Sequence, residues 1–377
     1  MNSKIKLLIV ADTYYPKVDG TLRFIEEFVK RARNEFDISL LVPNLGKSTK
    51  PKGVKNVTLI APSKIVKLSG YPNMKISIKN ICDIKKAVKE TDFVFVQGPA
   101  LISYLSIYYG KKYNKKIIFY KHHITWELYE NFFPEISKKF LIRIVRKLAI
   151  IFYNKCDLII IPYRELEDSL KQYGVKSEIR VGSLGIDIDQ FSISKNKKAS
   201  KKKLKLPLNK TIIGYVGRIS KEKNIDILLE AFNKVEFKDI FLLIVGGGNP
   251  DLVKKLKEIR NCHVTGFVNN VQDYLKATDI FVMPSLTETT SLATLEAMSC
   301  GLPVIATKVG FIKNYLVKDH NGIFFPRNSS TMLALKIEQL IKDPELMKTL
   351  GNNARKMVAY SFSWDRSVNK IKRILLE

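Results

Sequence analysis

The chain has 377 residues, of which 46% are apolar and 27% are charged, proportions that exclude general disorder. Its length favours two domains, each with its own core. The 64 basic and 36 acidic residues give a net charge of +28, which attracts polyanions such as nucleic acid, anionic lipid or phosphorylated metabolites without identifying any of them.

Three features of the sequence indicate the cellular compartment: the cysteines, the first residues and the hydropathy. Four cysteines lie far apart without the spacing of metal ligands, which is typical of reduced thiols in a cytoplasmic protein. The apolar run LLIVA is five residues long and is followed by Asp12, so we expect no signal peptide. No stretch reaches the roughly 18 uninterrupted apolar residues of a membrane span. We therefore expect a cytoplasmic protein.

The first half of the chain alternates short apolar runs with helical patterns such as residues 21–34 and 78–89. Continuous apolar strands that alternate with helices are typical of a parallel sheet covered on both faces. The predicted strands are residues 6–11, 37–42, 57–61, 93–97, 116–120 and 158–162.

Two loops of this half carry candidate site residues. Gly20 follows the first strand and precedes a helix, and a glycine there lets the backbone approach a phosphate closely. His122 and His123 follow the strand at 116–120, at the carboxyl end where the sites of α/β proteins gather. The alternative for the two histidines is a structural role inside the fold.

Residues 138–155 form a predicted amphipathic helix. Its apolar face contains Phe140, Leu141, Ile144, Val145, Leu148, Ile151 and Phe152. Its basic face contains Lys139, Arg143, Arg146 and Lys147. Such a helix can lie on an anionic membrane, or it can cover a sheet with its apolar face. We favour the second arrangement, in which the basic face still reaches lipid headgroups.

Residues 195–205 contain seven lysines in eleven positions, which predicts a solvated surface segment near a domain junction. A second series of strands and helices follows, and two successive series predict a two-domain α/β protein. A final helix is expected over residues 362–376. The predicted strands of the second series are residues 211–216, 241–245, 263–265, 280–283 and 303–306.

Arg218 and Lys223 lie five positions apart in the turn after strand 211–216. A guanidinium fork and an ammonium group can converge on a diphosphate and stabilise it as a leaving group. The alternative is a solvated surface turn, but the position directly after a strand favours the diphosphate site.

Residues 284–307 read as a strand end, a loop, a helix, a glycine stop and a strand. Ser291 is placed to cap a helix that runs to about residue 299, and Gly301 suits the left-handed position after its end. The backbone N–H groups near Ser291 and Leu292 can bind a phosphate. Glu288 before this helix and Glu296 on its second turn can hold sugar hydroxyl groups. This combination suits a sugar nucleotide.

Several segments together resemble the GT4 family of retaining glycosyltransferases with the GT-B fold. Glu288 and Glu296, separated by seven residues and followed by AMSCGLPVIAT, resemble the family signature. Further similarities are YVGRISKEKN (215–224), VGGGNP (245–250), LGIDIDQF (184–191) and ADTYYPKVDG (11–20). The variants TETTSLATLE and DTYYPKVDG look closest to the branch that glucosylates diacylglycerol.

The resemblance implies two Rossmann-like domains that face each other across a deep cleft. Residues 1–185 would form the acceptor-side domain, with the helix at 362–377 packing back on it, and residues 186–361 would bind the nucleotide sugar. The donor would contact Gly20, Arg218, Lys223, Glu288, Ser291, Leu292 and Glu296.

The resemblance also assigns the chemistry. In KHHITWELYENFF the spacing of His123 to the aromatic and acidic residues matches the lipid-glucosylating branch, so His123 rather than His122 would face the reacting sugar. The departing phosphate would accept the acceptor's proton, with His123 orienting the donor. Glu288, Arg218 and Lys223 complete the predicted catalytic set.

Two places depart from the family pattern, and one motif resembles a metal site of another fold. Asp19 stands where the family often has a second glycine, and residues 289–291 replace a loop that contains glycine. The motif Asp187-Ile188-Asp189 looks like the metal-binding DxD of another fold, but here it matches the domain-junction segment. We therefore expect no metal and no cofactor, with cationic side chains and helix amides neutralising the diphosphate.

The sequence therefore predicts a retaining hexosyltransferase that uses a nucleotide-sugar donor and a membrane-lipid acceptor. We expect it on the inner face of the cell membrane, where its charge would contact an anionic surface. The alternatives are a transferase of polysaccharide or glycan assembly, a nucleotide-sugar epimerase and a basic nucleic-acid-binding protein. No nucleic-acid-binding motif is evident, so no nucleic acid is expected as a partner.

Overall fold

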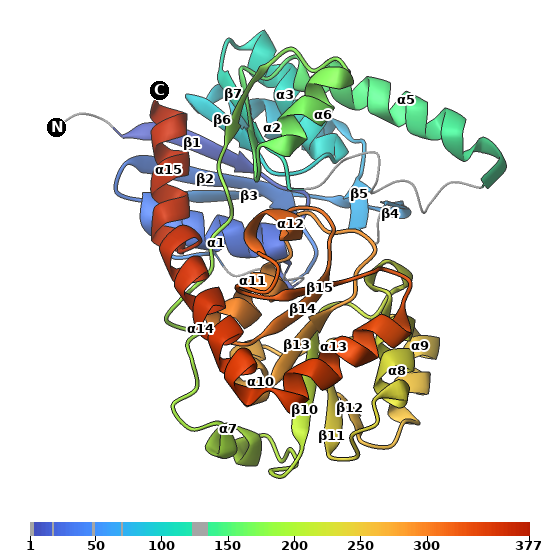
Figure 1. The fold of residues 1–377 in the computed structure, drawn as a ribbon. Helices are drawn as coiled ribbons and strands as arrows, with labels where there is room; N and C mark the ends of the chain where they lie inside the picture. The colour runs from blue at the N-terminus through green and yellow to red at the C-terminus, as the bar shows by residue number, and fades with distance from the viewer. Residues whose placement is uncertain (1–3, 17–18, 47–49, 69–70, 123–134) are drawn as a thin grey trace. The chain divides into compact units, whose positions relative to one another are not determined.

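The structure is a computed structural model that describes residues 4–16, 19–46, 50–68, 71–122 and 135–377 (Figure 1). The chain divides into two compact units: unit 1 comprises Met1–Gly185 with Asp365–Glu377, and unit 2 comprises Ile186–Trp364. Both units are α/β, and each main sheet is parallel, which confirms the predicted fold class. Which unit takes the donor and which takes the acceptor stays a prediction.

Unit 1 has a seven-stranded sheet in the order β3-β2-β1-β6-β7-β8-β9. Its strands are β1 Ile5–Val10, β2 Phe36–Pro43, β3 Asn56–Ile60, β6 Phe93–Val96, β7 Lys116–Tyr120, β8 Leu158–Ile161 and β9 Glu178–Val181. Its helices are α1 Gly20–Ala32, α2 Ile78–Lys89, α3 Leu101–Lys112, α5 Glu135–Tyr153, α6 Glu165–Gln172 and α15 Trp364–Leu376. The side chains of these strands are buried, as at Ile9, Phe95 and Ile118. Because a parallel sheet is covered on both faces, its strands have continuous apolar sequences.

Three strands of unit 1 are absent from the predicted set. Two of them, β4 Pro62–Leu68 and β5 Tyr71–Met74, form a separate antiparallel hairpin. The third, β9, is the last strand at one edge of the sheet, and charged Glu178 and Arg180 alternate there with apolar residues. An edge strand tolerates such charges, so β9 has no continuous apolar run to mark it.

Unit 2 has a six-stranded sheet in the order β12-β11-β10-β13-β14-β15. Its strands are β10 Thr211–Val216, β11 Ile240–Val245, β12 Cys262–Val264, β13 Ile280–Met283, β14 Val304–Thr307 and β15 Ile323–Phe325. Its helices are α7 Lys197–Lys203, the 3-10 helix η1 Lys221–Lys223, α8 Ile225–Lys234, α9 Pro250–Lys257, α10 Val271–Ala277, α11 Leu292–Ser299, α12 Ile312–Tyr315, α13 Ser330–Lys342 and α14 Pro344–Ser361. All five predicted strands of this series overlap observed ones, and only β15 is absent from the predicted set.

The lysine-rich segment differs from its prediction. Asn196 caps α7 by accepting a hydrogen bond from the Ala199 N–H, and the helix buries Lys201. The Lys201 Nζ lies 2.7 Å from an oxygen of Asp279 and 2.9 Å from the Lys210 carbonyl oxygen. A run predicted to be solvated therefore contains one buried lysine, Lys201, whose ion pair with Asp279 joins α7 to the residues just before β13.

Helix α5 also differs from the favoured prediction. Its buried side is centred on Ala149 and Tyr153, and Phe152 stacks on Tyr104 of α3. Much of the predicted apolar face is exposed instead, so the prediction that this face covers the sheet is wrong for Phe140, Ile144, Leu148 and Ile151. In Figure 1, α5 extends beyond the strands of unit 1. Within the described residues no helix is both long and apolar enough to cross a membrane.

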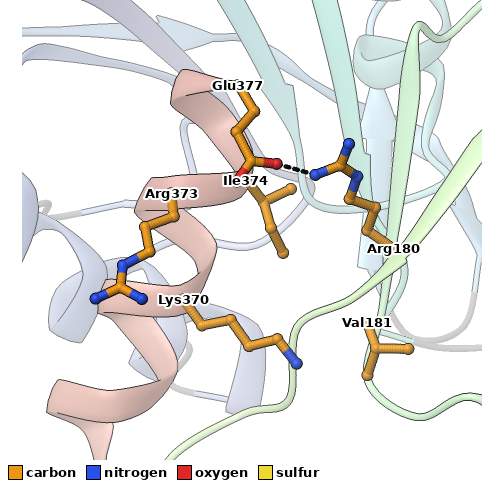
Figure 2. Close-up of a pocket in the computed structure, with 6 residues that line it drawn as sticks. All are labelled: Arg180, Val181, Lys370, Arg373, Ile374 and Glu377. Carbon is orange, nitrogen blue, oxygen red and sulfur yellow. Dashed lines mark hydrogen bonds and ion pairs between the residues drawn. The ribbon is translucent and has the colours of Figure 1, made fainter.

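The last helix of the chain, α15, belongs to unit 1 except for its first residue. Ile371 and Leu375 are fully buried, and Arg31 of α1 binds Asp365 at 2.5 Å. At the other end of the helix, Arg180 of β9 forms an ion pair with Glu377 (Figure 2). A hollow of about 340 Å³ beside this ion pair is lined by Arg180, Val181, Lys370, Arg373, Ile374 and Glu377, none of which is a predicted site residue.

Candidate active site

The candidate site lies at the carboxyl edge of the sheet of unit 2, where β10 leads into η1. Tyr215 is buried under this turn, and its hydroxyl donates to the Arg218 carbonyl oxygen at 2.8 Å. Burial raises the pKa of Tyr215 well above its ordinary value, which keeps the hydroxyl protonated as a donor. The turn that presents Arg218 and Lys223 is therefore held from below by a core residue.

Lys223 and Glu288 form an ion pair, with 2.7 Å between Nζ and Oε1. Their side chains are 18% and 9% exposed, and the Ser285 hydroxyl donates to the same Glu288 oxygen at 2.8 Å. Because β13 lies beside β10 in the sheet, the loop after β13 meets the turn after β10. The structure thus brings together two predicted catalytic residues that lie far apart in the sequence.

Arg218 is more exposed than Lys223 and pairs with a different carboxylate. Its guanidinium group lies 3.2 Å from the Glu222 carboxylate, and 70% of its side chain is exposed. Burial alone would raise the pKa of Glu222, but hydrogen bonds and the charges of Arg218 and Lys223 lower it below its ordinary value. An exposed guanidinium beside an ionised carboxylate can turn toward an anionic ligand at small cost.

Helix α11 begins after Ser291 and ends at Ser299, as predicted, but the predicted capping is wrong. Ser291 has a left-handed backbone with φ of 57°, and its side chain makes no capping bond. The Ser291 hydroxyl instead lies 2.8 Å from the Thr294 hydroxyl. The first N–H groups of the helix, at Leu292 and Ala293, have no acceptor within the helix, so a phosphate oxygen suits them.

The far end of α11 follows its prediction. Gly301 has φ of 72°, and the Leu302 N–H donates to the Ala297 carbonyl oxygen, which closes the helix in a Schellman motif. Glu296 lies on the second turn and is only 5% exposed. A carboxylate held this deep in unit 2 fits the role of a hydroxyl acceptor better than that of a surface charge.

The sequence reasoning missed two residues that hold the loop between Glu288 and α11. A Cβ on Gly310, whose φ is 50°, would lie 1.7 Å from the Glu288 carbonyl oxygen, so this close approach requires glycine. The buried Tyr315 donates its hydroxyl to the Thr290 carbonyl oxygen at 3.0 Å, and burial raises its pKa well above the ordinary value. A glycine after the apolar strand β14 was the only local signal of this contact.

Of the candidate residues of unit 1, the structure describes Gly20 and His122. Gly20 is the first residue of α1, and the Asp19 carboxylate caps the helix by accepting from the Leu22 N–H at 3.0 Å. His122 is 7% exposed, packs against Phe24 and lies 2.9 Å from the Gln97 amide oxygen through Nε2. His122 is thus buried and hydrogen-bonded inside unit 1, as the structural alternative predicts. His123 lies outside the described residues, so its role stays a prediction.

Asp187 of the DxD motif accepts hydrogen bonds from the backbone of its own turn. The Asp187 carboxylate accepts the N–H groups of Asp189 at 3.1 Å and Gln190 at 2.9 Å. In the part of the chain that the structure describes, no three His, Cys, Asp or Glu side chains are placed to hold a metal ion. That the reaction needs no metal stays a prediction.

Two family models match the chain and together span most of it. The model for "Glycosyltransferase Family 4" matches residues 18–190, and the model for "Glycosyl transferases group 1" matches residues 196–357.

Several relatives that match over most of their length are named as glycosyltransferases or as glycolipid synthases. An uncharacterised glycosyltransferase of Methanocaldococcus jannaschii is 26% identical over 98% of this chain and 98% of its own. Alpha-monoglucosyldiacylglycerol synthase of Acholeplasma laidlawii is 25% identical over 93% of this chain and 92% of its own. The synthase of the same name from Streptococcus pneumoniae is 26% identical over 95% of this chain and 83% of its own.

Solved structures share the fold at lower identity. Sucrose-phosphate synthase from Thermosynechococcus elongatus has a TM-score of 0.80 at 17% identity, over 99% of this chain and 98% of that one. Anabaena HepE in complex with UDP has a TM-score of 0.80 at 17% identity, over 98% of this chain and 99% of that one.

Proposed function

The chain belongs to the GT4 glycosyltransferases and has the GT-B fold, and on this basis we propose that it moves a hexose from a nucleotide-sugar donor to a membrane lipid with retention of the anomeric configuration. The donor half of the proposal rests on unit 2. The acceptor half rests on the surface of α5 and on the names of two full-length relatives.

The observation that carries the donor half is the Lys223–Glu288 ion pair. Lys223 holds a positive charge beside the start of α11, where helix N–H groups also favour an anion. A donor diphosphate would bind to the cationic groups of Lys223 and of the exposed Arg218. The Glu288 carboxylate would accept hydroxyl groups of the transferred sugar. HepE, which shares the fold, has been solved with UDP-glucose, and this supports a nucleotide sugar as donor.

The proposed reaction exchanges one bond at the anomeric carbon for another on the same face. The bond from this carbon to the phosphate oxygen breaks as the bond to the acceptor oxygen forms. The departing phosphate oxygen accepts the acceptor's proton, and the charge that develops on the diphosphate is stabilised by Lys223, Arg218 and the α11 amides. These groups neutralise the diphosphate without a metal or cofactor, and His123 orients the sugar.

The acceptor half is carried by the exposed side of α5. Phe140 is 65% exposed and Leu148 is 51% exposed, although water disfavours large apolar surfaces. The basic residues Lys139, Arg143 and Lys147 are exposed on the same helix. An apolar stripe bordered by cations matches the interface of an anionic bilayer, in which a lipid acceptor resides. On this basis we propose that the protein acts at the cytoplasmic face of the membrane.

The test of this function is direct. The purified protein is incubated with a panel of radiolabelled nucleotide sugars and total membrane lipid, and the organic phase is chromatographed. Label in a lipid product from one nucleotide sugar is the expected result. Label that enters only a water-soluble or polymeric product would refute the lipid acceptor and favour glycan assembly, and no transfer from any donor would refute the activity.

A further inference from the structure

A buried lysine lies directly after β7, at the carboxyl edge of the sheet of unit 1. Lys121 is 1% exposed. Lys201, the other buried lysine among those whose burial the structure describes, is 6% exposed and is paired with Asp279. Burying an ammonium group is unfavourable unless the fold supplies partners for it. A lysine kept at this depth, next to the candidate histidines, points to a function beyond packing.

Tyr153 of α5 contacts the ammonium group of Lys121. The Lys121 Nζ donates to the Tyr153 hydroxyl oxygen at 2.9 Å and lies 4.5 Å from the centre of the Tyr153 ring. An ammonium group is attracted to the face of an aromatic ring, and the attraction is stronger away from water. Tyr153 is itself fully buried, and its ring centre lies 5.1 Å from that of Phe119 in β7. The end of β7 is therefore bound to the last residue of α5.

The next residue fixes the strand end from the opposite face. Lys121 contacts α5, whereas His122 packs on Phe24 of α1, as expected for neighbouring side chains that alternate between the faces of a strand. His122 also lies 2.9 Å from the Gln97 amide oxygen. The backbone still belongs to the sheet at this point, because the Lys121 N–H donates to the Ile160 carbonyl oxygen at 2.9 Å. The chain thus leaves the sheet from a point held between α5 and α1.

We infer that Lys121 is a positioning residue for the sugar transfer. This inference rests on the proposed function, in which His123 orients the donor sugar. His123 follows Lys121 and His122 directly in the chain, so these two contacts fix the point from which the chain continues to His123. A misplacement of about 1 Å at a reacting group can lower a rate by on the order of a hundredfold. Lys121 therefore acts on the rate through His123 rather than on the sugar itself.

A double-mutant cycle between Lys121 and His123 tests the inference. Lys121→Met keeps the length of the side chain and removes the ammonium group. The assay uses the full-length protein, the radiolabelled nucleotide sugar that is transferred, and vesicles of total membrane lipid; the label keeps slow variants measurable. Lys121→Met is expected to lower kcat by roughly 10- to 100-fold and to leave the donor KM near native. In a His123→Ala background the same substitution should change kcat by no more than about twofold.

Thr91→Val is the matched control for stability. The buried Thr91 hydroxyl donates to the Lys6 carbonyl oxygen at 2.6 Å, near the amino ends of β1 and β6. The substitution removes a buried hydrogen bond from the same unit and leaves the strand end at Lys121 intact. It should lower the midpoint of urea unfolding and leave kcat near native. A loss of kcat as large as in Lys121→Met would show that reduced stability alone lowers turnover, and the inference would be wrong.

Each other outcome of the cycle has a distinct meaning. If Lys121→Met has native kcat while His123→Ala is impaired, the inference is wrong and the proposed function is untouched. If Lys121→Met lowers kcat by the same factor in both backgrounds, Lys121 acts independently of His123, and the inference is again wrong. A raised donor KM with native kcat would assign Lys121 to donor binding and would also overturn it. If His123→Ala has native kcat, the proposed role of His123 is itself wrong, and the inference is lost with it.

Discussion

Lys223 and Glu288 neutralise each other beside the start of a helix, and this pairing sets what each residue contributes. Glu288 is nearly buried, and its carboxylate is held by Lys223 and by the Ser285 hydroxyl. Removing one partner of such a buried pair destabilises the fold. Arg218 has no such structural duty, because most of its side chain is in water. Two cations assigned to one diphosphate therefore differ in how much the fold depends on them.

Alanine substitution should separate these two contributions. We expect Arg218→Ala and Lys223→Ala each to lower turnover at saturating donor by on the order of a hundredfold, the typical cost of losing one preorganised charge donor. Lys223→Ala should also lower the free energy of unfolding by about 1–3 kcal/mol, because it leaves Glu288 unpaired. Arg218→Ala should leave that free energy within about 0.5 kcal/mol of native. Steady-state kinetics and urea unfolding measure the two effects.

Lys221→Ala is the matched control, because Lys221 is exposed in the same turn. It should change neither turnover nor stability. Near-native turnover in both Arg218→Ala and Lys223→Ala would show that the diphosphate is held elsewhere.

Glu296 is the second residue that a single substitution can test. Its position on α11 beside the amides of the first turn predicts that it accepts a hydroxyl of the donor ribose. Glu296→Ala should weaken nucleoside diphosphate binding by about 1–3 kcal/mol, measured by calorimetry. Glu338→Ala is the control, because Glu338 is similarly buried in unit 2 but lies on α13, which carries no predicted site residue. Unchanged nucleotide affinity in Glu296→Ala would contradict the ribose assignment.

At the scale of elements, α5 shows how the same amphipathic pattern can serve two arrangements. A helix of this sequence could cover the sheet with its apolar face, and the pattern alone does not say which side meets the sheet. In the structure the small Ala149 and the aromatic Tyr153 take the buried side, and the larger aliphatic residues remain outside. Phe140, Ile144, Leu148 and Ile151 therefore belong to the surface of the protein and not to its core.

Liposome binding tests the basic residues of α5. Replacing Lys139, Arg143 and Lys147 with glutamine should reduce sedimentation with anionic liposomes, because each basic residue near such a surface contributes about 1 kcal/mol. Binding of the native protein should weaken as salt rises, since the attraction decays over roughly a Debye length. Arg146 is kept because its guanidinium lies over the Tyr173 ring at 4.5 Å.

A control variant carries the same change in net charge. Lys195, Lys198 and Lys202 are exposed near α7 of unit 2, and their replacement by glutamine should leave liposome binding near native. Equal losses in both triple variants would show that overall charge, rather than α5, attracts the protein. Equal sedimentation of the native protein with neutral and anionic vesicles would remove the electrostatic argument.

At the scale of the whole molecule, each unit has its own sheet and core, and the end of the chain returns to complete unit 1. Ile371→Ala and Leu375→Ala should each lower the stability of unit 1 by about 2–5 kcal/mol, because both side chains are fully buried. Urea unfolding followed by two probes, intrinsic fluorescence and nucleotide binding, measures this loss.

The neighbouring Leu376 provides the control for α15. It is 51% exposed, so Leu376→Ala should cost less than about 0.5 kcal/mol. Nucleoside diphosphate affinity should stay native in all three variants, since none of these residues is a predicted donor contact and each variant stays folded in the absence of urea. A loss of that affinity in Ile371→Ala would show that the packing of α15 also supports the donor site.

The sequence by itself determined the two β/α series, the parallel sheets and the helix between Glu288 and Gly301. These features are local: a strand buried on both faces needs a continuous apolar run, and a helix end needs a residue such as Gly301 that tolerates a left-handed backbone. The short strands β9 and β15 lie at sheet edges and carried no comparable signal.

Only the tertiary structure decided which residues meet. Lys223 and Glu288 pair because β10 and β13 are neighbours in the sheet, although β11 and β12 lie between them in the chain. Lys201 can be buried because it forms an ion pair with Asp279, which is distant in the sequence. Phe140 is exposed because another side of α5 packs against unit 1. Periodicity and charge describe one segment at a time, whereas burial depends on the partner that the fold supplies.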